Sequence, residues 1–224
     1  MVLTSTADVD LVVRTMAETI VANEKYFCEL DAVAADGDFG SSLARGFEVV
    51  LKDFVAFDRT SIGAFLKKIA LVISGKVGGT SGPLWGTAFL RAGAVAGDRL
   101  RLAPVDLIAM LRAAVAGIQQ RGGAQLGDKT LLDALVPAID SLEADLANPD
   151  GTADYGIAAL QRAADVATRA AEATTGLVAK KGRAAYTGER SVGSPDAGAV
   201  AIGVILQSIS AAWRESHGAG KEQR

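Results

Sequence analysis

The residues of this chain with the clearest chemical potential are three aspartates in the short segment 31–38. The segment reads Asp31-Ala-Val-Ala-Ala-Asp36-Gly-Asp38. Carboxylates this close repel one another unless a positive charge lies between them. A hard divalent cation with oxygen ligands supplies that charge, and Mg²⁺ typically keeps some waters and takes its other ligands from a phosphate. We therefore predict that Asp31, Asp36 and Asp38 bind magnesium.

The residues that follow favour a phosphate beside the metal. Gly40, Ser41 and Ser42 are expected to open a helix, whose free amides and positive end suit an anion. Two other interpretations of the segment stand beside this one. It could be an exposed N-capping cluster, in which one aspartate caps the helix and the others are solvated. Asp36-Gly-Asp38 could also hold a nucleophile of the haloacid-dehalogenase type, which requires a preceding strand in an α/β chain.

Three further loops are rich in glycine and polar residues. The loop 75–83 offers amides and the hydroxyls of Thr80 and Ser81 to an anion, although a plain flexible turn explains it equally. The loop 121–130 also fits a helix C-cap followed by an aspartate N-cap. The loop 180–198 contains two lysines and two arginines, which could neutralise phosphate charge or simply be solvated.

Apolar residues recur at helical spacing along most of the chain, and no alternating stretch of useful length predicts a strand. The pattern therefore predicts an all-α chain and disfavours the α/β architecture. We expect one domain over residues 1–224 with a flexible tail at 216–224. The eight predicted helices lie at about 7–27, 41–56, 61–74, 84–97, from Pro104 through Ile118, 129–147, 153–179 and 196–214.

The four unusual loops fall at alternate connections between these helices. If consecutive helices run antiparallel, as short connections favour, all four loops lie at one end of the bundle. Loops on a rigid scaffold often carry function. The sequence therefore predicts a binding site at that end.

Composition excludes several other classes of function. The only histidine, His217, lies in a polar tail, so a Ser-His-Asp or histidine–metal site is not expected. A single cysteine, Cys28, excludes an internal disulfide and a cysteine zinc site. The net charge of −3 comes without a basic stripe, so nucleic acid is an unexpected partner. Charges within the first apolar stretch and the absence of a long uncharged apolar run favour a cytoplasmic protein without a signal peptide or membrane span.

Taken together, the four loops resemble the nucleotide-binding L subunit, or domain, of the dihydroxyacetone kinase family. Four ordered motifs carry the resemblance, which extends over essentially the whole chain. They are Asp31…Asp36-Gly-Asp38-x-Gly40 with Ala44-Arg45-Gly46-Phe47, Gly79-Thr-Ser-Gly-Pro-Leu-Trp-Gly-Thr87, Gly127-Asp-Lys-Thr-Leu-Leu-Asp133, and Lys181-Gly-Arg-Ala-Ala-Tyr-Thr-Gly-Glu-Arg-Ser191 with Asp196-x-Gly198.

The resemblance implies an eight-helix antiparallel up-and-down barrel with the nucleotide, ADP or ATP, at one end. It implies magnesium, as two ions, on the three aspartates, and phosphate contacts from Phe39 to Ser42 and from Thr80 and Ser81. Arg183 is the expected catalytic residue. The rest of the nucleotide pocket is expected to be lined by Gly122, Leu131, Arg183, Asp196, Ala197 and Gly198.

The resemblance also implies that this chain is half of an enzyme. A separate K subunit would hold a ketose, and this chain would deliver the phosphoryl group from exchangeable ATP or from bound ADP rephosphorylated by a phosphotransferase-system protein. The alternative function is a non-catalytic ADP-binding module that reports to a partner, and a homodimer is possible. The family usually has histidine where Phe39 stands. This substitution alters the phosphate contacts and makes kinases of four-carbon ketoses such as erythrulose plausible relatives.

Overall fold

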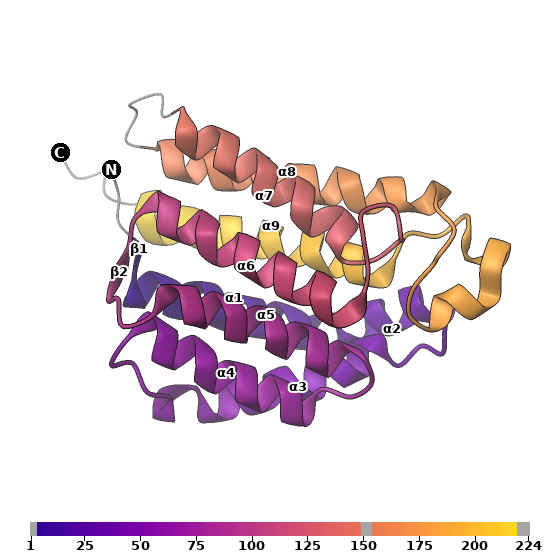
Figure 1. The fold of residues 1–224 in the computed structure, drawn as a ribbon, viewed down its shortest axis with the longest axis horizontal. Coiled ribbons are helices and arrows are strands. Elements are labelled where there is room, and N and C mark those ends of the chain that lie inside the picture. The colour runs from indigo at the N-terminus through magenta and orange to yellow at the C-terminus, as the bar shows by residue number, and fades with distance from the viewer. Residues whose placement is uncertain (1–3, 149–153, 219–224) are drawn as a thin grey trace.

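The computed structural model describes residues 4–148 and 154–218, which are almost entirely helical (Figure 1). Long helices lie side by side and alternate in direction, as predicted for an up-and-down bundle. The α-helices are α1 (Thr6–Ala22), α2 (Glu24–Ala32), α3 (Phe39–Asp53), α4 (Ile62–Lys76), α5 (Ser81–Ala96), α6 (Pro104–Gly122), α7 (Leu132–Ala147), α8 (Tyr155–Ala173) and α9 (Ala197–Gly218). Short 3₁₀ helices η1 (Phe54–Ala56), η2 (Thr174–Gly176) and η3 (Arg183–Ser191) and the two-residue strands β1 (Thr4–Ser5) and β2 (Arg101–Leu102) complete the described elements.

The all-α prediction is confirmed, and the main difference lies in the first predicted helix. The chain breaks at Asn23, so the predicted helix 7–27 is in fact the pair α1 and α2. The Asn23 side chain donates to the carbonyl oxygen of Thr19 at 2.8 Å. An asparagine amide that bonds to nearby backbone competes with the helix, which explains the break.

Two later boundaries also differ. The predicted helix 153–179 ends at Ala173, and the chain continues through η2. The predicted tail from 216 is still helical as far as Gly218, and residues 219–224 lie outside the described part of the chain. His217 is therefore on a helix, where its ring stacks on Trp213 and its Nε2 lies 2.9 Å from Asp8 Oδ1.

The core consists of small and aliphatic residues with separate aromatic contacts, such as those of Phe47 with Trp85 and of Phe54 with Phe65. Phe47, Phe54 and Phe65 are fully buried between the first five helices. On α8, buried Ala163 and Ala167 allow close packing against α9, where a Cβ added to Gly203 would lie 3.3 Å from Thr168 Cα. Inside the ring of helices lies an apolar cavity of about 480 Å³. The alanine-rich composition thus serves tight helix contacts, as the sequence indicated.

The two ends of the bundle carry different connections. At one end lie β1, β2, the start of α4 and the end of α7, and we call this the closed end (Figure 1). At the other lie the connections 33–38, 77–80, 123–131 and 174–196, and we call this the loop end. The predicted convergence of the four loops on one end is confirmed.

The helix α9 has the length and hydropathy of a membrane-spanning segment. Its packing argues against that role, because it is one of the helices that surround the apolar cavity and it packs against α1, α7 and α8 (Figure 1). The core helix of a soluble protein meets the same criteria.

Candidate magnesium and nucleotide site

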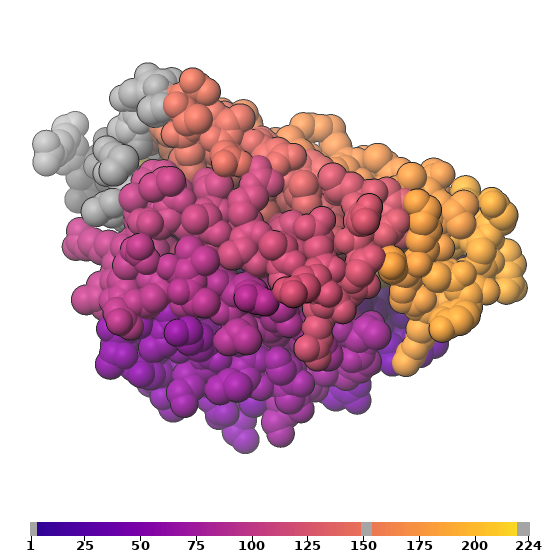
Figure 2. Space-filling model, viewed as in Figure 1, coloured from indigo at the N-terminus to yellow at the C-terminus, as the bar shows by residue number. Residues whose placement is uncertain are grey.

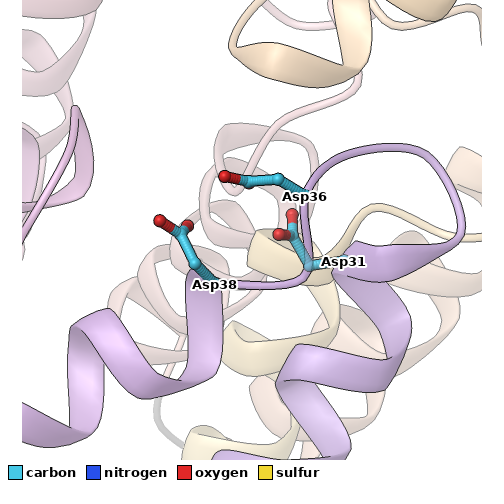
Figure 3. A group of neighbouring side chains, drawn as sticks. All are labelled: Asp31, Asp36 and Asp38. Atoms are coloured by element: carbon cyan, nitrogen blue, oxygen red, sulfur yellow. The ribbon is translucent and has the colours of Figure 1, made fainter.

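The three aspartates come together at the loop end (Figure 3). Asp31 lies in the last turn of α2, Asp36 in the following connection, and Asp38 directly before α3. One carboxylate oxygen from each lies within 4.8 Å of the other two. Gly37 turns the chain between them with a φ of +73°, a conformation that glycine adopts without steric cost. An all-oxygen donor set of this kind fits a magnesium ion.

The negative charges of the three aspartates are partly balanced by nearby backbone amides and by one arginine from a distant segment. Burial raises the pKa of Asp31, as does the neighbouring Asp38, while backbone amides including that of Phe39 act in the opposite direction. The side chains of Asp36 and Asp38 are about half exposed. The guanidinium of Arg183 contacts Asp36 and lies 3.1 Å from Asp38 Oδ2. A positive charge from a segment far along the chain therefore already faces these carboxylates.

The first turn of α3 is held against α2 by a close approach at Gly40. A Cβ added to Gly40 would lie 2.0 Å from the carbonyl oxygen of Glu24, so a side chain there would force the helices apart. The Ser41 amide donates to Cys28 Sγ at 3.2 Å. The Phe39 amide donates to Asp31 Oδ2 at 3.4 Å. These contacts place the amino end of α3 directly beside the carboxylates, but they also use the amides of Phe39 and Ser41, whose predicted phosphate contacts stay predictions.

The hydroxyls of the two serines have different surroundings. Ser41 Oγ donates to the carbonyl oxygen of Asp38 at 3.1 Å and stays partly exposed. Ser42 is buried and its Oγ accepts from Arg45 Nη2 at 3.2 Å. The Ser42 side chain is therefore already used inside the protein, and its predicted phosphate contact stays a prediction.

The second loop packs on this same turn. A Cβ added to Gly78 would lie 3.2 Å from Ser42 Oγ. Thr80 then precedes α5 without a capping hydrogen bond from its side chain, and it is exposed, while Ser81 is half-buried in the first turn. Both predicted phosphate contacts of this loop thus lie at an uncapped helix start next to the aspartate segment.

The third and fourth loops complete the surroundings. A Cβ added to Gly122 would lie 3.0 Å from Leu84 Cδ2 in α5, and one added to Gly198 would lie 3.2 Å from Leu131 Cβ. The predicted pocket residues Leu131 and Gly198 are therefore in contact, although they are far apart in sequence. Buried Ala197 opens α9 between Gly198 and the carboxyl of Asp196.

Asp196 has a structural partner of its own. Its Oδ2 accepts from the Ala199 amide at 2.7 Å, which caps α9. Burial raises the pKa of Asp196 to about 7, with a smaller contribution from the negative charge of Asp133.

These contacts link the four loops into a ring around the loop end. The first loop meets the second at Ser42 and Gly78, and the fourth returns to the first through Arg183. Figure 2 shows the fourth loop overhanging the aspartate segment, with a recess between it and the connection from α6 to α7. Beside this recess lies a hollow of about 480 Å³, lined by Gln119, Gly123, Ala124, Gln125 and Leu126.

Two residues near the site were not predicted to have a role there. Cys28 is half-buried in α2, and its Sγ accepts a hydrogen bond from the Ser41 amide. Lys129 is buried and bonds to the fourth loop. It stands inside the motif Gly127-Asp-Lys-Thr, but no local pattern indicates which distant atoms its side chain meets.

Known proteins resemble the chain in both sequence and structure. The DAK2 domain family model matches residues 33–211. The ADP-binding subunit DhaL of the PEP-dependent dihydroxyacetone kinase of Escherichia coli K12 is 37% identical over 195 residues, covering 85% of this chain and 89% of that protein. D-Erythrulose kinase of Mycolicibacterium smegmatis is 36% identical over 197 residues, covering 87% of this chain and 33% of that protein.

A solved structure extends the resemblance to the fold. The dihydroxyacetone kinase of C. freundii, in complex with AMP-PNP and Mg²⁺, matches with a TM-score of 0.69 and 26% identity, over 94% of this chain and 35% of that one. The chain therefore spans about a third of the length of this kinase and of the erythrulose kinase. On the match to the DAK2 model and to the L subunit over most of both chains, this chain belongs to the DAK2 domain family, that of the nucleotide-binding L subunits and domains of the dihydroxyacetone kinases.

Proposed function

We propose that this chain is the phosphoryl-donating subunit of a ketose kinase, which binds a magnesium–nucleotide complex at the loop end and passes the phosphoryl group to a ketose held by a separate K subunit. The observation that carries the proposal is the convergence of Asp31, Asp36 and Asp38 within 4.8 Å beside an uncapped helix start. The relatives support it, because they include an ADP-binding kinase subunit and a kinase in complex with AMP-PNP and Mg²⁺.

In this proposal the three aspartates hold two magnesium ions. Bound there, magnesium neutralises charge on the phosphates. The amino end of α3, from Phe39 to Ser42, and the exposed Thr80 with Ser81 hold the phosphate oxygens. Each is a helix start and carries the positive end of a helix dipole. In the ligand-free chain the amides of Phe39 and Ser41 donate to Asp31 and Cys28, so in this proposal they exchange those acceptors for phosphate oxygens. The ring of Phe39 packs 6.2 Å from that of Phe27, so at this position the backbone contributes and the side chain does not.

Arg183 is the proposed catalytic residue. Its guanidinium already reaches Asp36 and Asp38, so it is within range of a phosphate beside them. A planar, permanently charged guanidinium matches the oxygens of a transferring phosphoryl group and stabilises their charge. In this proposal Gly122, Leu131 and the turn from Asp196 to Gly198 line the rest of the nucleotide pocket.

We further propose that residues 1–224 form one domain in the cytoplasm. The phosphoryl donor is either exchangeable ATP or an ADP that stays bound and is rephosphorylated by a phosphotransferase-system protein. Mass spectrometry of the denatured, freshly purified protein separates the two. ADP retained at about one per chain supports the second donor, and an empty protein supports the first. Light scattering of the isolated chain decides whether it also forms a homodimer.

The central test is the affinity for ADP with and without Mg²⁺, measured by calorimetry. Replacing Asp36 and Asp38 together by alanine is expected to weaken magnesium-dependent binding by about a hundredfold or more, because two charged ligands are lost. Asp53→Ala combined with Asp98→Ala removes the same charge from exposed positions outside the loop end and is the matched control. Unchanged magnesium-dependent binding in the first variant would contradict the proposal.

A second test concerns catalysis. Mixed with a K subunit, magnesium and the phosphoryl donor, the wild-type chain is expected to sustain phosphorylation of dihydroxyacetone or erythrulose. Arg183→Ala is expected to lower the rate about a thousandfold, as the loss of a charge-stabilising arginine does in other phosphoryl transfers. Nucleotide binding without phosphorylation of any ketose would instead favour the ADP-binding module.

A further inference from the structure

Lys129 is a buried lysine in the connection between α6 and α7. Only 3% of its surface is exposed. An ammonium carries three N–H bonds, so the backbone oxygens around it surround the charge and share its donors. The four acceptors of its Nζ are the carbonyl oxygens of Thr174 at 2.9 Å, Leu177 at 3.1 Å, Ser191 at 2.7 Å and Ser194 at 2.7 Å.

The four oxygens lie on both sides of the segment that carries Arg183. Thr174 and Leu177 precede η3, Ser191 is its last residue, and Ser194 follows it. We call residues 177–194 the Arg183 loop. The ammonium of Lys129 therefore joins the two ends of this loop at one point. Weaker links support the same closure, since the Gly193 amide donates to the Thr175 carbonyl oxygen at 3.0 Å.

The backbone conformation at position 129 is unfavourable for a lysine, which indicates that the side-chain contacts of Lys129 compensate for it. Among the described residues it is the one non-glycine residue with a positive φ, at +61°. Long side chains rarely adopt this conformation, which glycine would accept without strain. Burial also lowers the pKa of Lys129. A residue that is unfavourable both in its backbone and in its buried charge is explained by the contacts that the charge makes.

The Arg183 loop leads directly to the candidate site. Its η3 helix begins at Arg183, whose guanidinium meets Asp36 and Asp38. Neutral hydrogen bonds also hold the loop near its ends, from the Ala179 amide to Ser191 Oγ at 2.9 Å and from the Lys180 amide to the Asp128 carbonyl oxygen at 3.0 Å. Lys129 adds a contact in which a single buried charge meets both ends, and the side chains of Tyr186 and Val192 in the loop are exposed. Holding the two ends of the loop together therefore limits the positions that the guanidinium of Arg183 can reach.

We propose that Lys129 is a positioning residue, whose ammonium closes the Arg183 loop and thereby holds Arg183 at the site of phosphoryl transfer. No hydrogen bond or ion pair in the described part of the chain joins Lys129 to Asp31, Asp36 or Asp38, and its charge also faces Asp196 of the predicted pocket. The proposed route to the site is therefore through Arg183, and the second experiment separates that route from a direct one. The catalytic part of this inference rests on the proposed function, whereas the closure of the loop does not.

The first experiment therefore needs no nucleotide. Hydrogen exchange measured by mass spectrometry on the ligand-free chain compares wild type with Lys129→Met, which keeps the length of the side chain and removes its charge. Exchange in the Arg183 loop is expected to quicken about tenfold or more, because hydrogen bonds to a charged group are lost, while α4 stays unchanged. Lys180→Met is the matched control, since Lys180 also reaches a carbonyl oxygen, that of Gly127, but is exposed, and it should change loop exchange less than twofold.

A second variant, Lys129→Gly, keeps the test decisive if Lys129→Met does not fold. It removes the ammonium and also removes the strain of the positive φ. If the side chain closes the loop, Lys129→Gly opens it as Lys129→Met does. If either folded variant keeps the wild-type exchange of the Arg183 loop, the proposal is wrong.

The second experiment tests whether Lys129 acts through Arg183. The affinity for ADP and magnesium is measured for wild type, Lys129→Met, Arg183→Ala and the double variant. Lys129→Met is expected to weaken binding about tenfold in the wild-type background and less than twofold in the Arg183→Ala background. If Lys129→Met instead weakens binding about tenfold in the Arg183→Ala background as well, Lys129 acts independently of Arg183 and the positioning role is wrong.

The two experiments separate this inference from the proposed function. If the wild-type chain binds no nucleotide, the proposed function fails, and the hydrogen-exchange result still decides whether Lys129 closes the loop. If nucleotide binds but Lys129→Met changes neither loop exchange nor affinity, the inference fails alone.

Discussion

The closed end and the loop end of the bundle are built from the same helices but differ in how helix starts are satisfied. At the closed end, Ser5 and Asp8 form a capping box on α1, and the Ser61 hydroxyl accepts from the Ala64 amide at the start of α4. Asp106 similarly accepts from the Ala103 amide before α6. The first amides of these helices are bonded within the protein, which stabilises the fold.

At the loop end, the two helices that carry the predicted phosphate contacts begin differently. Asp38 before α3 and Thr80 before α5 form no capping hydrogen bond with their side chains. The helix α9 begins at the same end and is capped by Asp196, so this end does not lack caps altogether. The helix starts beside the aspartates thus differ from those of α1 and α4, and a missing cap there fits the proposed phosphate contacts. The helices α7 and α8 also begin without a side-chain cap, so a missing cap points to the site only together with the aspartate cluster.

The largest expected difference between the two ends is in how folding stability depends on pH. At the loop end, burial raises the pKa of Asp196 to about 7. The folded state then binds a proton more tightly than the unfolded state, so stability is highest below about pH 4 and is lost as the pH rises towards 7. Between pH 5 and pH 8 the contribution of Asp196 should fall by roughly 3 kcal/mol, because one pKa unit corresponds to about 1.4 kcal/mol.

Asp196→Asn should remove this loss while keeping a side-chain oxygen for the Ala199 amide. Urea unfolding at a series of pH values measures it. Asp8, at the closed end, is the matched control with the opposite sign. Burial raises its pKa, but the Ser5 hydrogen bonds outweigh this and the net direction is downward. Asp8 therefore stabilises the fold above about pH 4 and loses that contribution in acid. If Asp196→Asn shows the same slope between pH 5 and pH 8 as wild type, the carboxyl is not held neutral.

Close contacts of glycine offer the next comparison. A Cβ added to Gly40 at the loop end would lie 2.0 Å from the Glu24 carbonyl oxygen, and one added to Gly63 near the closed end would lie 2.3 Å from the Gly97 carbonyl oxygen. Each Gly→Ala change should destabilise the chain by about 1–3 kcal/mol, because the backbone must move. The two variants should therefore look alike in urea unfolding.

Binding should separate these two variants. Gly40→Ala displaces the first turn of α3 from the aspartates, so affinity for magnesium–ADP should fall about tenfold or more, whereas Gly63→Ala should leave it within about twofold. Calorimetry on the folded variants measures this. Equal losses of affinity in both would show that the loop end responds to general destabilisation and is not a separately positioned site.

The sequence predicted most of the helices and the common end of the four loops, but few of the side-chain contacts that join those loops. Helical periodicity and the position of the four loops are local signals, so the all-α fold and the common end were predictable. The break at Asn23 was missed because the apolar pattern continues from Ile20 to Phe27 across it. That error matters for the site, since the separate helix α2 carries Asp31 and the backbone that packs on Gly40.

Long-range contacts could not be predicted from local pattern at all. The ion pair of Arg183 with Asp36 and the four carbonyl contacts of Lys129 join segments that are far apart in sequence. Arg183 was predicted through family resemblance, which carries long-range information that periodicity lacks. Lys129 had the same motif context, but a lysine in a polar loop is ordinarily solvated, and its burial follows only from the packed structure.

The smallest effects should come from the caps themselves, and they bear most directly on the difference between the ends. Ser61→Ala removes the hydroxyl that accepts from the Ala64 amide and should cost about 1 kcal/mol of unfolding free energy without affecting magnesium–ADP binding. Thr80→Ala removes a hydroxyl that caps nothing, so it should cost about 0.5 kcal/mol or less in the ligand-free chain. Its effect should appear instead as a severalfold loss of nucleotide affinity, because the proposed contact of Thr80 with a phosphate is lost.

Unfolding by urea, with and without magnesium–ADP, measures both effects in one experiment. A bound ligand adds to stability in proportion to its affinity, so Thr80→Ala should narrow the gap between the two curves and Ser61→Ala should shift both curves equally. The reverse pattern would mean that Thr80 serves the fold and Ser61 the ligand. In that case an uncapped helix start would be no guide to the phosphate site, and the aspartate cluster would have to carry the assignment alone.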